Sequence, residues 1–303
     1  MNPILAIRRL SHSYGSKTYG HKNVLHKIDL AIESGTFYAI LGRNGAGKTT
    51  LLKILAGLLV AKRGSAHILG NDCSRLSTTD WQQIGYVSEN QPIYDWLTGN
   101  ELIAFTSPLY TNWDMEFCNQ LQQRLHLPLE RKICTYSKGE RMKLALLLAM
   151  AFHPQILLLD EPFSGLDVLA KEELIACLLE VTQQARWSVV LASHDLMEVE
   201  RLADIVGLID GGTLKISEPL DSLLNRFRRI QVFGHPMLEP DASLRQIATT
   251  DNGFSFIETA FDAERETLLR QRYGPQIDIS PMPLRDILLF LFSTLPVQQQ
   301  TAL

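Results

Sequence analysis

Short apolar runs alternate with segments of helical spacing along the first 230 or so residues of the chain. The runs at 36–41, 156–159 and 188–193 are almost continuously apolar, as in parallel strands that are buried on both faces of a sheet. Residues 49–56 and 141–152, by contrast, have the composition and spacing of apolar helices. These patterns predict an open α/β sheet with helices packed against it.

A mainly helical segment and a separate C-terminal region complete the predicted organisation. Residues 89–152 are interrupted by prolines and a glycine and predict a helical subdomain. After residue 228 the pattern becomes that of a small α+β region, 229–303, with no recognisable chemistry motif. Its predicted elements are strands at 230–233, 254–257 and 277–279, a polar helix at 263–272 and a buried helix at about 284–291. The sequence leaves three roles open for this region, namely regulation, support of a dimer and contact with a partner.

Net charge, cysteine spacing and the length of the apolar runs limit the classes of protein to which the chain can belong. The net charge of −4 gives no sign of nucleic acid as the main partner. The four cysteines, at 73, 118, 134 and 177, lie far apart and predict reduced thiols of a cytosolic protein. No apolar run approaches the roughly 20 residues that cross a bilayer. The N-terminus reads as a first strand, not as a signal peptide. We therefore expect a soluble chain.

Residues 42–49, which read Gly-Arg-Asn-Gly-Ala-Gly-Lys-Thr, match the phosphate-binding pattern G-x-x-x-x-G-K-[ST] in full. The flanking segments predict a strand before the motif and a helix after it, as this loop requires. With glycine at about 7% of residues, a chance match in the chain is on the order of 1%. The glycines let backbone N–H groups point at phosphates, and the helix N-terminus adds its positive dipole end. The loop predicts a nucleoside triphosphate site, with Lys48 at the β- and γ-phosphates and Thr49 on magnesium.

Two further predicted strands end in groups that suit phosphate chemistry. The run 156–159 is followed by Asp160 and Glu161, and the run 188–193 by His194. Open α/β sheets bind ligands at the carboxyl ends of their strands. One carboxylate there can hold magnesium, and a second can orient or deprotonate an attacking water. Taken alone, these residues also fit a solvated strand end and a helix cap. Beside the phosphate loop, they predict catalytic groups.

A short segment ahead of the acidic strand, residues 136–140, reads Tyr-Ser-Lys-Gly-Glu. The spacing of Ser137 and Glu140 is that of a capping box, in which the serine accepts the N3 amide hydrogen and the glutamate reaches back to the cap. The segment therefore predicts the N-terminus of the apolar helix that continues to Phe152.

The order and spacing of these motifs resemble those of ATP-binding cassette (ABC) ATPases, the nucleotide-binding subunits of ABC transporters, over about residues 3–228. That family usually carries a Leu-Ser-Gly-Gly-Gln signature at the place of residues 136–140, and a D-loop at the place of residues 164–167. Its switch histidine matches His194, and its adenine-stacking aromatic residue matches Tyr14. The resemblance implies a P-loop NTPase fold of the ABC type. The implied regions are a nucleotide-binding domain at 1–228, its helical subdomain at about 89–152 and the C-terminal accessory region at 229–303.

The resemblance also implies roles for individual residues in ATP hydrolysis. The implied nucleotide-binding residues are Tyr14, Gly42, Arg43, Asn44, Gly45, Ala46, Gly47, Lys48, Thr49, Thr50, Ser137, Gly139 and Asp167. The implied catalytic residues are Lys48, Glu161 and His194. The implied magnesium ligands are Thr49, Asp160 and Glu89. Within the first set, Ser137 and Gly139 act on the nucleotide of a second domain, and Asp167 links the two sites.

Three residues depart from the family pattern. Lys138 replaces the first glycine of the signature, and Glu140 replaces its glutamine. Glu89 stands where the family usually has a glutamine that touches magnesium and the attacking water. Lys138 either adds a cation to the site or points at solvent, and Glu89 is either a magnesium ligand or a surface loop residue.

The resemblance implies a cytoplasmic subunit, peripheral on the inner face of the cell membrane. With one phosphate loop and one signature, the chain must pair with a second nucleotide-binding domain, its own copy or a relative. A separate transmembrane permease would carry the substrate. The run 44–50 and the Ser-Lys-Gly signature resemble the exporter-associated branch of the family.

Two alternative functions are open. One is a soluble ABC ATPase that acts on ribosomes or DNA, although the chain lacks the second cassette or the inserted coiled coil of such proteins. The other is a regulatory nucleotide-binding subunit with little turnover, which is compatible with the departures at Glu89 and Glu140.

Overall fold

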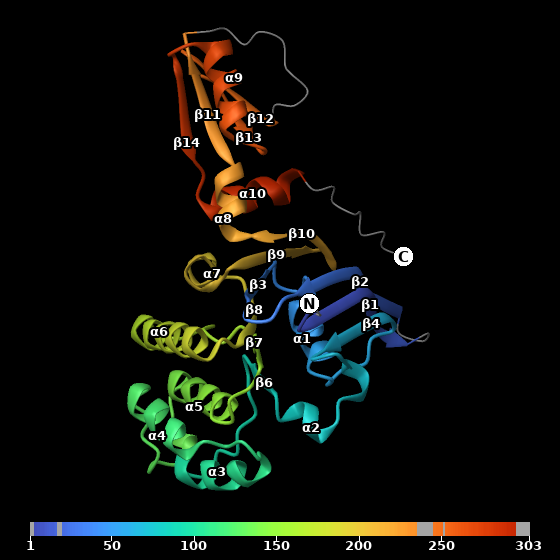
Figure 1. Ribbon diagram of the computed structural model, residues 1–303, viewed down its shortest axis with the longest axis vertical. Helices are drawn as coiled ribbons and strands as arrows, with labels where there is room; N and C mark the ends of the chain where they lie inside the picture. Colours follow the sequence, from blue (N-terminus) through green and yellow to red (C-terminus); the bar gives the residue numbers. More distant parts are fainter. Residues whose placement is uncertain (1–2, 17–19, 235–244, 251, 295–303) are drawn as a thin grey trace. The chain divides into compact units, whose positions relative to one another are not determined.

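The computed structural model describes residues 3–16, 20–234, 245–250 and 252–294 (Figure 1). The chain divides into two compact units, residues 1–217 and 218–303. This division does not test the limits that the sequence predicts for the nucleotide-binding domain and its helical subdomain, and these limits stay predictions. Within the described residues, no helix is both long enough and apolar enough to cross a bilayer.

A six-stranded sheet organises the first unit (Figure 1). In spatial order its strands are β10 (Thr213–Pro219), β9 (Ile205–Asp210), β3 (Phe37–Leu41), β8 (Ser188–Ser193), β7 (Ile156–Asp160) and β6 (Ile84–Ser88). The pairings from β9 through to β6 are all parallel. The three apolar runs are therefore confirmed as β3, β7 and β8.

A second sheet in this unit is antiparallel and holds the N-terminal strand that the sequence predicts. In spatial order it contains β2 (Gly20–Ile32), β1 (Leu5–Ser16), β4 (Arg63–Ile68) and β5 (Asn71–Asp72). The helices of the unit are α1 (Lys48–Leu55), α2 (Thr78–Trp81), α3 (Gly99–Thr106), α4 (Met115–Arg124), α5 (Lys138–Met150), α6 (Val168–Ala185) and α7 (Leu196–Leu202). Short 3-10 helices lie at Cys73–Arg75, Ser107–Leu109 and Ile133–Thr135.

Alternate residues of the parallel sheet face two different hydrophobic clusters. Along β7, Leu157 and Leu159 belong to one cluster and Ile156 and Leu158 to the other. The first cluster contains residues of α5 and α6, and the second contains residues of α1 and of the antiparallel sheet. In Figure 1, α5 and α6 lie on one side of the parallel sheet, and α1 and the antiparallel sheet lie on the other. Because both faces are covered, each strand is uniformly apolar instead of alternating.

The carboxyl ends of the parallel strands lie level with one another. In register, Ser88 pairs with Asp160, Asp160 with Ala192, and Leu41 with Ser193. The residues that follow each strand therefore emerge at one edge of the sheet, where open α/β sheets bind ligands. These residues are the loop 42–47, Glu89, Glu161 and His194.

The second unit is a small α+β structure. Its antiparallel sheet has the spatial order β12 (Arg245–Thr250), β13 (Gly253–Glu258), β11 (Arg228–Phe233) and β14 (Ile277–Pro281). Its helices are α8 (Leu220–Arg226), α9 (Ala263–Tyr273) and α10 (Leu284–Thr294). The elements predicted for this region are thus confirmed. The additional strand β12 escaped prediction because its sequence, Arg-Gln-Ile-Ala-Thr-Thr, contains no apolar run.

Candidate active site

The backbone between β3 and α1 requires glycine at two positions. A Cβ atom on Gly42 would lie 2.5 Å from the carbonyl oxygen of Ile209. Gly47 has a φ of +110°, and a Cβ atom there would lie 2.7 Å from the Leu25 side chain. Helix α1 begins at the next residue, Lys48. The loop thus leads tightly from a strand into a helix N-terminus, which is the arrangement that binds phosphate groups.

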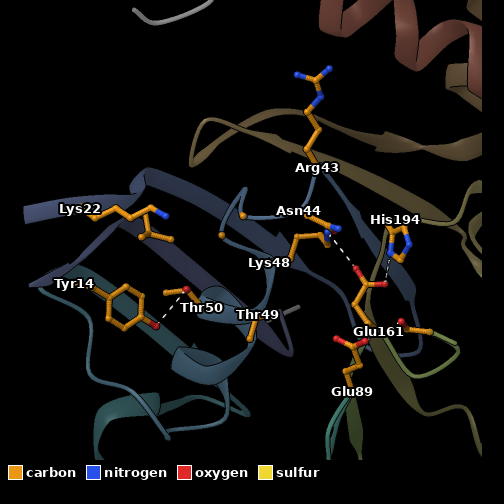
Figure 2. Close-up of a pocket in the computed structure, with 14 residues that line it drawn as sticks. Tyr14, Lys22, Arg43, Asn44, Lys48, Thr49, Thr50, Glu89, Glu161 and His194 are labelled. Atoms are coloured by element: carbon orange, nitrogen blue, oxygen red, sulfur yellow. Dashed lines mark hydrogen bonds and ion pairs between the residues drawn. The ribbon is translucent and has the colours of Figure 1, made fainter. Parts of the chain in front are cut away.

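Lys48, Glu161 and His194 form a continuous chain of polar contacts (Figure 2). Lys48 Nζ donates to the Gly42 carbonyl oxygen at 2.7 Å and lies 3.2 Å from Glu161 Oε1. The other carboxylate oxygen, Glu161 Oε2, lies 2.7 Å from His194 Nδ1. The side chains of Lys48 and Glu161 are only 6% and 12% exposed, so solvent screens their attraction weakly. Glu161 therefore contacts both of the other residues with an implied catalytic role.

The backbone at Glu161 is in the left-handed region, with a φ of +51°. Such a conformation costs a residue other than glycine on the order of 1–3 kcal/mol and persists only where the surroundings hold it. Here the Glu161 N–H donates to the Ala192 carbonyl oxygen at 2.9 Å, and both carboxylate oxygens have partners. The strained turn directs the carboxylate of Glu161 toward Lys48 at the end of the phosphate loop (Figure 2).

Thr49 and Asp160 offer two oxygen ligands side by side, since Thr49 Oγ1 donates to Asp160 Oδ1 at 3.0 Å. Burial raises the pKa of Asp160 above its ordinary value; the hydrogen bond from Thr49 opposes this and the charge of Glu161 adds to it. Magnesium prefers oxygen ligands and typically takes one or two from the protein beside phosphates and waters. In the part of the chain that the structure describes, no group of three or more acidic, histidine or cysteine side chains could hold a metal ion. The Thr49 and Asp160 oxygens therefore fit magnesium that a nucleotide brings with it.

A pocket of about 400 Å³ lies along the phosphate loop (Figure 2). Eleven of the implied site residues line it: Tyr14, Arg43, Asn44, Gly45, Gly47, Lys48, Thr49, Thr50, Glu89, Glu161 and His194. Its other lining residues are Lys22, Val24 and Ser164. The register of β1 and β2 places Lys22 opposite Tyr14, and Ser164 belongs to the segment that resembles the D-loop. Sequence reasoning missed Lys22 because this pairing is not visible along the chain.

Tyr14 lies at the end of the pocket away from Glu161 (Figure 2). Its side chain is on β1, 43% exposed, and its hydroxyl oxygen is 3.3 Å from Thr50 Oγ1. An exposed aromatic ring beside a phosphate loop can stack on a base.

Six implied site residues do not line this pocket: Gly42, Ala46, Ser137, Gly139, Asp160 and Asp167. Ser137, Gly139 and Asp167 lie at helix N-termini. Ser137 accepts from the Glu140 N–H at 3.1 Å, and the Glu140 carboxylate accepts from the Ser137 N–H at 2.7 Å. The predicted capping box at the start of α5 is thereby confirmed. Gly139 lies within the same turn, and Asp167 caps α6 by accepting from the Ala170 N–H at 2.9 Å. Ser137 and Asp167 therefore also have an ordinary structural role as helix caps.

Comparison with known proteins assigns this chain to a family. Residues 25–164 match the ABC transporter family. The uncharacterized ABC transporter ATP-binding protein YdbJ of Bacillus subtilis is 33% identical over 215 residues, which cover 70% of this chain and 68% of that protein. The bacitracin transport ATP-binding protein BcrA of Enterococcus faecalis is 29% identical, with coverage of 72% and 71%. The sulfate/thiosulfate import ATP-binding protein CysA of Yersinia pestis is 34% identical, with coverage of 66% and 57%.

Solved structures agree with this assignment. A structure described as the ATP-binding subunit of an ABC transporter is 29% identical and superposes with a TM-score of 0.63 over 73% of this chain and 91% of its own. A cassette solved as a dimer bound to ADP and Pi shares the fold, with 21% identity and a TM-score of 0.65 over 71% and 98% of the two chains. The site is that of a nucleotide-binding cassette. The chain belongs to the ATP-binding proteins of ABC transporters, and its reaction is the hydrolysis of ATP.

Proposed function

We propose that this subunit works in a head-to-tail dimer and couples ATP hydrolysis to transport through a separate membrane protein, on the inner face of the cell membrane. The main support is the polar chain from Lys48 through Glu161 to His194, beside a phosphate loop (Figure 2). A buried carboxylate between a phosphate-binding cation and a histidine is arranged to act on a water at the γ-phosphate.

Each of these side chains has a distinct part in the proposed reaction. Lys48 binds the β- and γ-phosphates, while Tyr14 stacks on the adenine. Glu161 Oε1 accepts the proton of the attacking water, and the contact of Oε2 with His194 holds the carboxylate in orientation. Thr49 and Asp160 hold magnesium, which when bound neutralises charge on the phosphates.

The dimer is proposed because one chain supplies only part of the machinery near its own pocket. Ser137, Gly139 and Asp167 are not among the residues that line the described pocket. Ser137 and Gly139 nevertheless sit at the N-terminus of the 13-residue helix α5, whose dipole favours negative charge. In a head-to-tail dimer this end would face the γ-phosphate that the partner's loop binds.

Export is the proposed direction of transport. It rests on the resemblance of residues 44–50 and 137–139 to the exporter-associated branch. The matched relatives carry both kinds of name, bacitracin transport for BcrA and sulfate/thiosulfate import for CysA. Inside-out vesicles that hold this chain and its membrane protein test the direction with labelled bacitracin and sulfate as probes, because an exporter accumulates its substrate in the lumen after ATP addition.

The coupling is tested by ATP turnover of the full chain with magnesium, with and without its membrane protein in vesicles. We expect turnover in both samples and a clear increase when the membrane protein is present. ATP binding without turnover in either sample would favour the regulatory alternative. Turnover that ignores the membrane protein but responds to ribosomes or DNA would favour the soluble alternative.

A further inference from the structure

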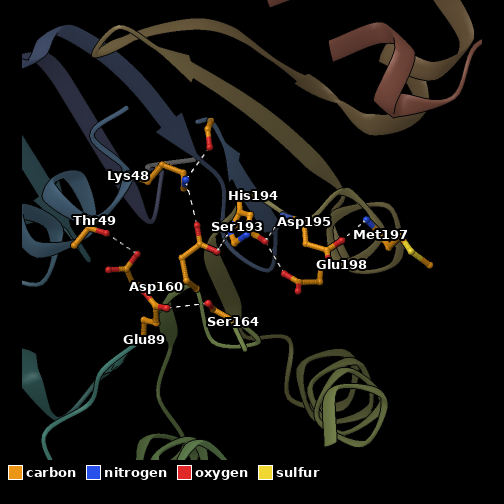
Figure 3. Close-up of polar contacts among 12 residues, drawn as sticks. Lys48, Thr49, Glu89, Asp160, Ser164, Ser193, His194, Asp195, Met197 and Glu198 are labelled. Atoms are coloured by element: carbon orange, nitrogen blue, oxygen red, sulfur yellow. Dashed lines mark hydrogen bonds and ion pairs between the residues drawn. The ribbon is translucent and has the colours of Figure 1, made fainter. Parts of the chain in front are cut away.

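Glu89 connects three segments of the cassette at the edge of the nucleotide pocket. It is the first residue after β6, and its Oε1 accepts a hydrogen bond from Ser164 Oγ at 2.8 Å (Figure 3). The same oxygen lies 3.8 Å from the Nζ of Lys138, the first residue of α5. The loop after β6, the loop after β7 and the start of α5 therefore meet at one carboxylate oxygen.

The Lys138 side chain lies against the loop after β7 as well. A Cβ atom built on Gly165 would lie 2.9 Å from Lys138 Nζ and within 3.7 Å of two carbons of the same side chain. Gly165 has a φ of +68°, a backbone conformation that favours glycine. The absence of a side chain at this position also leaves room for Lys138. Lys138 thus lies over the loop that carries Ser164, although nearly half of its side chain is exposed.

The charges around the pocket explain why this contact matters. Glu89 and Glu161 both line a pocket that receives a triphosphate, and carboxylates there repel the bound anion. Glu161 is paired with Lys48 at 3.2 Å, and Glu89 is paired with Lys138 at 3.8 Å. Each acidic side chain of the pocket lining therefore has its own cation within the same chain.

We propose that Lys138 is a positioning residue for ATP hydrolysis that acts through Glu89. Together with the Ser164 hydroxyl, its ammonium group holds the Glu89 carboxylate at the pocket edge and offsets its charge next to the phosphates. Lys138 acts on the nucleotide pocket of its own chain, whereas Ser137 and Gly139 beside it serve the partner's site. This inference rests on the proposed function of the pocket.

The test measures KM and kcat for magnesium ATP on the full chain in two backgrounds. Lys138→Met keeps the length of the side chain and removes its charge. It should raise KM about two- to fivefold at low salt, the range of exposed ion pairs, and change kcat less. In 0.5 M salt the increase in KM should be smaller, because salt screens both the attraction between Lys138 and Glu89 and the repulsion between Glu89 and the phosphates. Lys138→Arg should retain the KM of the parent.

The second background, Glu89→Gln, separates this role from others. With no carboxylate left to hold, Lys138→Met should add little change in KM. An equal increase in both backgrounds would show that Lys138 acts on a nucleotide directly, and an unchanged KM at low salt would also overturn the inference. Lys132→Met is the matched control, since this lysine is exposed, lies six residues earlier in the chain and has the same charge. If the parent itself neither binds nor hydrolyses ATP, the proposed function fails instead.

Discussion

Lys48 Nζ lies 3.2 Å from Glu161 Oε1, and both side chains are largely buried. The residue expected to bind the γ-phosphate is thereby joined to the residue expected to activate the water. A phosphate group at Lys48 competes with Glu161 for the same ammonium. We expect ATP to draw Lys48 toward the phosphates and to leave Glu161 Oε1 available for the proton of the attacking water.

Replacing the proposed base should separate binding from turnover. Glu161→Gln keeps the shape of the side chain and a hydrogen bond to His194 but removes the basic carboxylate. ATP binding should persist, while turnover falls about 100- to 10,000-fold, the usual contribution of a general base. Nucleotide binding by filtration and phosphate release under saturating ATP measure the two effects.

The same Glu161→Gln variant should accumulate as a dimer with ATP bound, because hydrolysis normally reopens the interface. Size-exclusion chromatography with and without ATP provides this readout. Turnover within twofold of the parent would remove Glu161 from its role.

The proposed head-to-tail dimer predicts complementation between two inactive variants. Lys48→Ala should lose tight ATP binding, because backbone N–H groups cannot replace the charge at the phosphates. Ser137→Ala should bind ATP almost normally but turn over poorly, since Ser137 would serve the opposite nucleotide. A mixture of the two variants should recover part of the activity, through dimers with one intact composite site. Heterodimers that form, as shown by differently tagged chains, yet stay inactive would rule out this geometry or the independent action of its two sites.

The sequence predicted those features that depend on a short stretch of chain. Continuous apolar runs identified β3, β7 and β8, because strands covered on both faces need no polar alternation. The spacing of Ser137 and Glu140 identified the start of α5, because a capping box is local. The proximity of Glu161 and His194 followed from a general rule about the edges of parallel sheets.

Features that depend on register or on distant pairs were not predictable. The position of Lys22 opposite Tyr14 depends on the pairing of β1 with β2, which contains several register shifts. The contact of Glu89 with Lys138 needs the loop after β6 to meet α5. The sequence therefore left Lys138 between two interpretations, and the structure shows it beside Glu89.

A charge cluster at the start of α7, formed by Lys171, Asp195 and Glu198, predicts a pH-dependent effect on stability. Glu198 is only 4% exposed and lies 2.8 Å from Lys171 Nζ, while its Oε2 accepts from Ser193 Oγ at 2.5 Å. Lys171→Met would leave this carboxylate, and that of Asp195, which Lys171 also contacts, without their cation. We expect a loss of about 1–3 kcal/mol at pH 7, below the 3–5 kcal/mol of fully buried pairs because Lys171 is partly exposed.

The loss of unfolding free energy caused by Lys171→Met should become smaller as the pH falls from 7 to 5. Burial raises the pKa of Glu198, and removal of Lys171 raises it further, so the carboxyl group of the variant becomes neutral and no longer needs a cation. Urea unfolding of parent and variant at both pH values measures the difference. Arg201→Met, which removes the exposed partner of Glu172, is the control and should cause a much smaller change. A loss from Lys171→Met that is equal at both pH values would contradict this explanation.

A cluster of exposed aromatic residues marks the surface that we expect to meet the membrane protein. Tyr94 lines a groove of about 620 Å³ and contacts two further exposed aromatic rings, with centroid distances of 5.0 Å to Trp96 and 5.8 Å to Phe105. Trp96 is 64% exposed, so it contributes little to the core, whereas the neighbouring Leu97 packs against a core cluster. Clustered exposed aromatic residues are typical anchors of protein interfaces. We therefore expect Tyr94 or Trp96 to contact a short helix of the membrane protein.

Alanine at the docking residue should leave the chain folded and able to bind ATP but weaken its assembly with the membrane protein. Truncation of such an anchor typically costs about 2 kcal/mol or more, which corresponds to roughly a 30-fold loss of affinity. Co-purification of Tyr94→Ala and Trp96→Ala with the membrane protein measures the effect, and thermal unfolding checks the fold. Leu97→Ala is the comparison for a packing role and should lower stability instead. Unfolding of both aromatic variants would assign them to packing, and undiminished assembly of both would exclude this docking site.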